Sequence, residues 1–150
     1  MASEKPKTQV AAAEADQVSR ILLVWINEYP NLPVDLIDFE YLRPDVTSMS
    51  LSLIQGVYKT RQYITGGYEA ECQFKLIYRL KPSGNNQRLT ADEVLNGIAD
   101  WAVSREDKPE LGGGRIFRRL VSNTRSALFA RYEDGDEDHQ ILMTMTYEVI

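Results

Sequence analysis

The stretch of sequence that decides the fold is Tyr68-Glu69-Ala70-Glu71-Cys72-Gln73-Phe74-Lys75-Leu76-Ile77-Tyr78-Arg79-Leu80. Apolar and polar residues alternate along it, and only Ile77 breaks the two-residue period. Because successive side chains of a strand point to opposite faces of a sheet, this pattern predicts a long strand with one buried and one polar face. Strands of this kind are typical of antiparallel sheets.

Shorter alternating runs on both sides of this strand predict the rest of the sheet. The strand is preceded by Thr65-Gly66-Gly67, which is typical of a hairpin turn, so its partner is expected over 57–64. Further strands are predicted over 34–42, with a bulge where the alternation slips, and over 49–53, 115–121, 125–132 and 140–150.

Two segments have the three- and four-residue apolar spacing of a helix. The first spans about 11–29, with Thr8 as a candidate cap and Pro30 at its end. In the second, Thr90-Ala91-Asp92-Glu93 matches a capping box ahead of an apolar stripe over 94–102. The order helix, strands, helix, strands predicts an α+β fold, in which a mostly antiparallel sheet has two main helices packed on one face.

Length and composition indicate a single domain. The 150 residues are 43% hydrophobic, which suffices for one core, and we expect a flexible N-terminal arm over 1–9 followed by a single α+β domain over 10–150. The longest unbroken apolar run, 21–26, is far shorter than a membrane span, so no membrane partner is expected. Cys72 is the only cysteine, which excludes an internal disulfide and favours a reducing compartment.

Charge is sorted along the last part of the chain. With 17 Lys and Arg against 22 Asp and Glu, the formal net charge is −5, which argues against a protein that grips nucleic acid through its phosphates. The segment 115–131 nevertheless has five arginines and no acid, and 133–138 has five acids. A surface that faces a protein partner is the favoured interpretation, and direct contact with nucleic acid is the alternative. The candidate interaction or lumen residues are Arg115, Arg118, Arg119, Arg125, Glu133, Asp134, Asp136, Glu137 and Asp138.

The residue types predict no catalytic site, no metal site and no cofactor. A structural zinc site needs four nitrogen or sulfur ligands, and the chain has one histidine and one cysteine. The run 134–138 begins like a calcium loop, but His139 and Met145 stand where an EF-hand needs glycine and glutamate, so a solvated hairpin tip is expected. Gly112-Gly113-Gly114 lacks the residues of a phosphate-binding loop. A small metal-dependent or His139-based hydrolase stays open as an alternative of another class.

Several motifs follow one another in a recognisable order between Val18 and Ile150. The first are Gln55-Gly56-Val57, the stretch Arg61-Gln62-Tyr63-Ile64-Thr65-Gly66-Gly67-Tyr68-Glu69-Ala70-Glu71-Cys72-Gln73-Phe74, and Tyr78-Arg79-Leu80-Lys81-Pro82. They are followed by Gln87-Arg88-Leu89, a helix that ends in Trp101, and alternating threonines in the final strand, Thr144 and Thr146. In this order the chain resembles the tail terminators of long-tailed (siphovirus-type) bacteriophages, a group that includes small proteins known as minor capsid proteins.

The resemblance implies a structural virion protein with no catalytic residues. Such a protein is expected to form a homo-oligomeric ring of six copies that caps the tail tube and joins the tail to the head connector. Its partners would be the tail-tube protein and the connector protein, with DNA passing through the ring without specific binding. Its place would be the tail or neck of the virion, after assembly in the host cytoplasm. A head-completion, neck or tail-tube protein of a phage is the related alternative.

Charge sorting adds a hypothesis about that ring. The acidic turn and the arginine group either face different neighbours, or the acids line the channel through which DNA slides.

Overall fold

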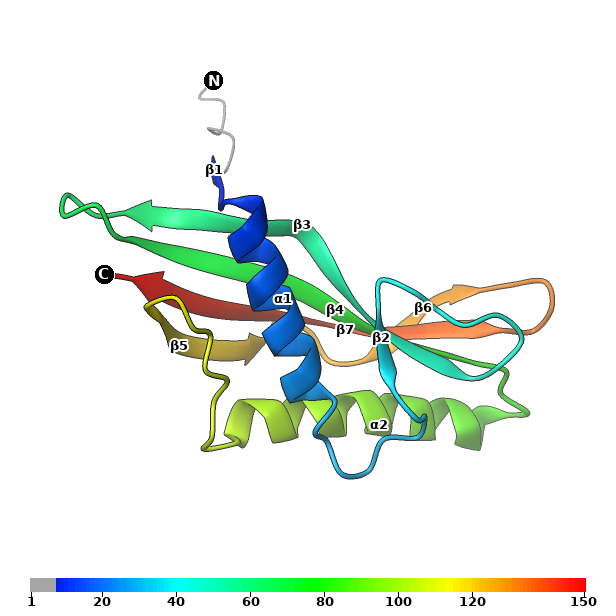
Figure 1. Ribbon diagram of the computed structural model, residues 1–150. Helices are drawn as coiled ribbons and strands as arrows, with labels where there is room; N and C mark the ends of the chain where they lie inside the picture. Colours follow the sequence, from blue (N-terminus) through cyan, green and yellow to red (C-terminus); the bar gives the residue numbers. More distant parts are fainter. Residues whose placement is uncertain (1–7) are drawn as a thin grey trace, which may run out of the picture.

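The computed structural model describes residues 8–150, and in this range it has two helices and seven strands (Figure 1). In chain order these are β1 (Thr8–Gln9), α1 (Ala12–Ile26), β2 (Ile37–Phe39), β3 (Ser48–Gln62), β4 (Tyr68–Leu80), α2 (Asn85–Ser104), β5 (Arg115–Ser122), β6 (Ala127–Arg131) and β7 (Glu137–Val149). The α+β class predicted from the sequence is confirmed.

The strands form one sheet in the order β1-β3-β4-β7-β5, with β2 paired to β3 and β6 paired to β7. All of these pairs are antiparallel except β2 with β3, which is parallel. The centre of the sheet is the pair β4–β7, which runs from Tyr68 opposite Val149 to Leu80 opposite Glu137. The alternating stretch quoted first is therefore the central strand, as its pattern predicts for a strand with one buried face.

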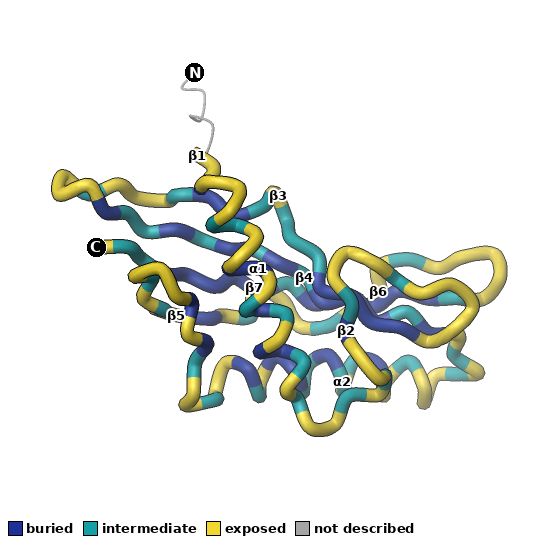
Figure 2. Tube along the Cα trace, in the orientation of Figure 1, coloured by how far each residue is buried: buried dark blue, intermediate teal, exposed yellow. Residues whose placement is uncertain are grey.

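Both helices cover the same face of the sheet (Figure 1). Helix α1 packs on β2 and β3, and α2 packs on β4, β5 and β7. The two helices meet where Trp25 and Trp101 stack, with 5.7 Å between ring centroids. In Figure 2 the buried residues lie along the central strands and at intervals along both helices. The core there contains side chains from every layer, among them Leu22, Ile26, Leu51, Phe74, Leu76, Leu95, Ile98, Ile141, Met143 and Met145.

The strands that were expected over 49–53 and 57–64 are one strand, β3. The step from Leu53 to Val57 lies opposite the shorter step from Phe74 to Cys72, so β3 carries two extra residues in a bulge. Gly56, in this bulge, has φ of +75°, which glycine adopts without strain. Because the insertion is even, the apolar residues on both sides of it still face the core. The two alternating runs of the sequence are therefore in phase within one strand.

The expected strand over 34–42 is wrong in length. Only Ile37–Phe39 pairs with β3 as a strand, and the chain turns away at Glu40, whose φ is +50°. There the Tyr41 N–H donates to Ser50 Oγ at 3.1 Å. Backbone and hydroxyl groups satisfy each other here, which explains why the segment leaves the strand.

The capping box expected at Thr90 is also wrong, because α2 begins five residues earlier at Asn85. The Thr90 hydroxyl donates to the Asn86 carbonyl at 2.9 Å, inside the helix. The start of α2 is supported by Gln87, whose Oε1 accepts the Ser83 N–H at 2.8 Å. Gln87 thus accepts a backbone N–H ahead of the helix, which is the role that the capping box predicted for Glu93.

Helix α1 begins at Ala12 and not next to Thr8. Thr8 and Gln9 form β1 and pair with Lys59 and Tyr58 of β3, so these two residues of the expected arm are part of the sheet. Residues 1–7 of that arm lie outside the described residues.

A carboxylate that the sequence did not single out joins α1 to the sheet. The Glu14 carboxylate accepts hydrogen bonds from the hydroxyls of Tyr68 on β4 and Tyr147 on β7. Burial and the bond to Glu14 raise the pKa of Tyr68 to about 12, and the same two causes raise the pKa of Tyr147. Both phenols therefore stay protonated and act as donors.

The turn between β3 and β4 generates a prediction, because a Cβ on Gly67 would overlap the Val149 carbonyl oxygen. We expect Gly67→Ala to separate the ends of β4 and β7 and to lower the free energy of unfolding by about 1–3 kcal/mol. The control is Gly84→Ala, where nothing lies within 4 Å of the new Cβ and only a few tenths of a kcal/mol from a weaker helix cap are expected. Urea denaturation measures both, and equal midpoints for the two variants would contradict this packing.

Candidate functional site

The acidic run singled out in the sequence divides into an exposed turn and a buried group. Glu137 and Asp138 are 3% exposed, so the expected solvated tip is wrong for these two residues. His139, the next residue, is 2% exposed. The three residues open β7, where Glu137 and His139 lie opposite Leu80 and Tyr78 on the helix-covered face and Asp138 points to the other face. The strand buries a short charged sequence on both sides of the sheet, so each charge needs a partner.

Two arginines and the histidine surround the Glu137 carboxylate. Arg88 Nε of α2 lies 2.9 Å away and Arg131 Nε of β6 lies 3.0 Å away. Burial on its own would raise the pKa of Glu137, but hydrogen bonds from Arg88, Arg131 and His139 outweigh burial and hold its pKa below the usual range. Glu137 is therefore an anion at neutral pH, and it joins α2, β6 and β7.

Asp138 forms the equivalent pair on the other face. Arg79, directly opposite on β4, donates to its two oxygens at 2.7 and 2.8 Å, which is the strong bidentate geometry. The Tyr132 hydroxyl donates to the same carboxylate at 2.8 Å, and the Arg79 guanidinium lies 4.8 Å from the Tyr132 ring centroid. The bond to Asp138 is the main cause that raises the pKa of Arg79 above its usual range.

His139 lies between two carboxylates. Its Nδ1 is 2.9 Å from Asp92 Oδ1 and its Nε2 is 3.3 Å from Glu137 Oε1, so only the doubly protonated ring can donate to both. The Ser126 hydroxyl donates to Asp92 Oδ1 at 2.8 Å. A carboxylate thus separates the hydroxyl from the imidazole, whereas activation of a serine requires the hydroxyl to donate to the imidazole.

The structure does not bring the arginines of 115–131 together into one patch. Arg115 Nη1 donates to Gln17 and to the Leu111 carbonyl, each at 2.9 Å, on the side of α1. Arg125 pairs with Asp100 of α2 at 2.8 Å. Arg118 pairs with Glu148 on the face away from the helices. Arg119 is exposed on that face, and no ion pair joins it to another residue of the described range 8–150.

The exposed part of the acidic run is the turn 133–136 between β6 and β7. Gly135 has φ of +95°, and the Asp136 N–H donates to Asp134 Oδ1 at 2.9 Å, which holds the pKa of Asp134 below its usual range. The Lys81 side chain lies beside Gly135, and the cavity of about 350 Å³ at this turn is lined by Asp45 and Lys81 together with Asp134 and Asp136. Glu133, Asp134 and Asp136 are therefore the acids of the run that stay available to a partner.

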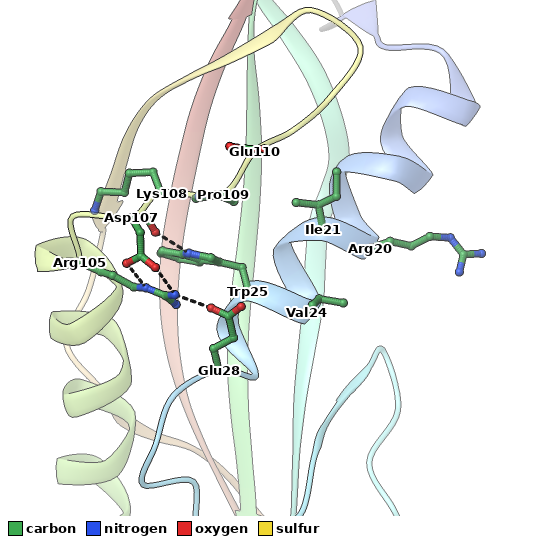
Figure 3. Close-up of a pocket in the computed structure, with 10 residues that line it drawn as sticks. All are labelled: Arg20, Ile21, Val24, Trp25, Glu28, Arg105, Asp107, Lys108, Pro109 and Glu110. Atoms are coloured by element: carbon green, nitrogen blue, oxygen red, sulfur yellow. Dashed lines mark hydrogen bonds and ion pairs between the residues drawn. The ribbon is translucent and has the colours of Figure 1, made fainter.

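A second polar cluster, which the sequence did not single out, lies between α1 and the end of α2 (Figure 3). The Arg105 guanidinium is 2.5 Å from both Glu28 and Asp107, and it lies over the rings of Trp25 and Trp101 at 5.3 and 4.8 Å. A groove of about 420 Å³ runs beside the cluster. Nothing local in the sequence indicates that an arginine lies against these two tryptophans.

Within residues 8–150, no three His, Cys, Asp or Glu side chains are placed to hold a metal ion. Cys72 is buried, and burial raises its pKa to about 12, so it lies in the core as a protonated thiol. Neither helix in the described range combines the length and the apolar character that crossing a bilayer requires. Comparison with models of known protein families finds no match for the chain, and comparison with curated proteins finds none either.

The lowered pKa of Glu137 predicts that the free energy of unfolding depends on pH. In the unfolded chain a glutamate binds its proton near pH 4.3, and the folded pKa is lower. The unfolded state therefore takes up this proton first as the pH falls, and the stabilisation is present above about pH 4.3 and is lost below it. We expect Glu137→Gln to lower the free energy of unfolding by about 2 kcal/mol at pH 7 and to flatten its decline in acid.

Urea denaturation between pH 3 and pH 7 measures both effects. The matched control is Glu133→Gln in the exposed turn, which should leave the stability and its slope close to those of the original chain. A Glu137→Gln variant that behaves like this control would contradict the structural role of the cluster.

Proposed function

We propose that this chain is a structural protein of a long-tailed bacteriophage, a tail terminator that forms a ring, caps the tail tube and joins the tail to the head connector. The observation that carries the proposal is that both edges of the sheet carry exposed apolar side chains. Near the β3 edge these are Leu36, Phe39, Tyr41 and Val46, and along the β5–β6 edge they are Ile116, Val121, Leu128, Phe129 and Tyr132. Exposed edges with grouped apolar residues are typical of surfaces that other chains cover.

The hairpin of β3 and β4 supports the same function. It extends beyond both helices (Figure 1), and Ile64 in its turn is fully exposed. Ile150, next to Gly67 of the same turn, is 78% exposed. An apolar turn that projects from the end of the sheet is suited to contact with a neighbouring subunit, which would remove Ile64 and Ile150 from water.

The order of motifs along the chain points to a terminator, and the buried charges remove support from the hydrolase alternative. His139 faces Asp92 and Glu137, and both contacts belong to the network that joins α2 to the sheet. A head-completion or tail-tube protein is the remaining alternative. The two are separated by behaviour, because a tube protein elongates a tail whereas a terminator binds one end and stops elongation.

The test is to add the purified chain to a purified tail-tube protein of the same phage and to measure tube lengths by electron microscopy. A terminator should give tubes of limited length with the chain at one end only. Tubes that elongate as before, or that contain the chain along their length, would contradict the proposal.

The exposed acidic turn gives a prediction for the assembled particle. In the combined variant Glu133→Gln, Asp134→Asn and Asp136→Asn, we expect a folded protein that yields fewer joined head–tail particles, because the turn loses the charge that faces the connector or the DNA channel. The control neutralises three exposed acids elsewhere, Glu93→Gln, Glu106→Gln and Glu110→Gln. Particle counts from electron microscopy compare the two, and equal counts would rule out a role for the turn.

A further inference from the structure

The β3 edge of the sheet has a groove with an acidic rim. Strand β1 pairs with Tyr58 and Lys59 and β2 pairs with 49–51, so within the described range no strand covers 52–56 of β3 on this side. The cavity at this gap has about 410 Å³. Its apolar wall includes Leu23, Phe39 and Leu53, and the carboxylates of Asp16 and Glu40 line it as well, with Arg20 as the one cation.

The opposite edge of the sheet has a basic ridge. It is formed by Ile116, Arg118, Arg119 and Val121 of β5. Arg119 and Val121 lie opposite Thr146 and Thr144, on the face away from the helices. Ile116 and Val121 are about two-fifths exposed, at 38% and 41%. The ridge therefore combines apolar side chains with a guanidinium that no acid of residues 8–150 neutralises.

The two surfaces carry opposite charge. The groove has Asp16 and Glu40 against Arg20, and the ridge has Arg118 and Arg119 against Glu148, which pairs with Arg118. Since the whole chain has a net charge of −5, two copies repel each other unless local charges are matched. A symmetric contact would place acid against acid or arginine against arginine, whereas a head-to-tail contact matches them.

From this complementarity we infer that the occupant of the groove is a second copy of this chain, whose β5 ridge docks against the gap between β1 and β2. The apolar side chains of the ridge cover Phe39 and Leu53, and Arg119 approaches Asp16 and Glu40. A head-to-tail contact repeats from copy to copy and either closes into a ring or continues as a filament. The inference rests on the proposed function, since it names the surfaces through which the ring is built.

Two variants test the two surfaces separately. Arg119→Glu reverses the ridge, and Asp16→Lys combined with Glu40→Gln reverses the groove while keeping the Glu40 Oε1 acceptor that the Leu53 N–H uses at 3.3 Å. All three side chains are exposed, so the variants should fold, and thermal unfolding checks this. The control is Lys81→Glu, which makes the same charge change at an exposed position in the loop between β4 and α2.

Sedimentation velocity over a concentration series measures the assembly. The unchanged chain should rise above the monomer mass of 17.1 kDa as its concentration increases, and less so at high salt, because the contact is electrostatic. Each reversed variant alone should associate about tenfold more weakly, and the control should not. An equimolar mixture of the two variants should assemble again, because every contact in it can match opposite charges.

An unchanged chain that stays monomeric, a reversed variant that assembles as before, or a mixture that stays dissociated would each overturn the inference. Retention of duplex DNA that Arg119→Glu abolishes, with no change in mass, would assign the ridge to nucleic acid instead. If the chain assembles through these surfaces but does not stop tube growth, the contact is supported and the proposed function is wrong. If the chain still stops tube growth after both reversals, the proposed function is supported and the contact is wrong.

Discussion

The pairing of β4 with β7 along their whole length is the constraint on which the rest of this structure depends. The pair lies at the centre of the sheet, and its inward residues belong to the core, with α2 packed on both strands and α1 on the neighbouring β3. A slip of one residue would turn every side chain of one strand to the opposite face. Arg79 would then no longer lie opposite Asp138, and Glu137 would leave Arg88 of α2. The buried charges at the start of β7 therefore help to set the register of the strands that bury them.

These ion pairs also explain why part of the acidic run 133–138, which the sequence suggested as a partner surface, instead holds the fold together. Asp138 is held by Arg79 on one face, and Glu137 is held by Arg88 and Arg131 on the other. Burying a carboxylate is costly unless a cation and further hydrogen bonds compensate for the lost water, and both carboxylates have these. The charges that remain for neighbours are those of the exposed turn and of β5.

The edges of the sheet connect this architecture to the proposed function. The edge strands β1, β2, β5 and β6 are shorter than the central strands, and exposed apolar side chains lie along both edges. Two edges of opposite charge favour a directional arrangement of copies over a symmetric pair. A protein that acts by its shape among copies needs a rigid sheet and distinct surfaces at its edges, and the fold has both.

The sequence by itself determined the elements that depend on local periodicity. The alternation of β4 predicted the central strand and its buried face, Thr65-Gly66-Gly67 predicted the hairpin, and the apolar stripes predicted both helices, because each pattern arises from neighbours a few positions apart. The helix starts were less predictable, since Gln87 and the capping box at Thr90 offered competing local signals. Of the candidate site, the exposed turn was predicted correctly, whereas Glu137 and Asp138 were placed in solvent.

Only the tertiary structure decided which charges are buried, because their partners are remote in the chain. Arg79 is 59 residues from Asp138, and Arg88 is 49 residues from Glu137. Likewise, Glu14 meets Tyr147 across 133 residues. Whether a run of charged residues is exposed or buried depends on the side chains that pack against it, and only the fold brings those partners together.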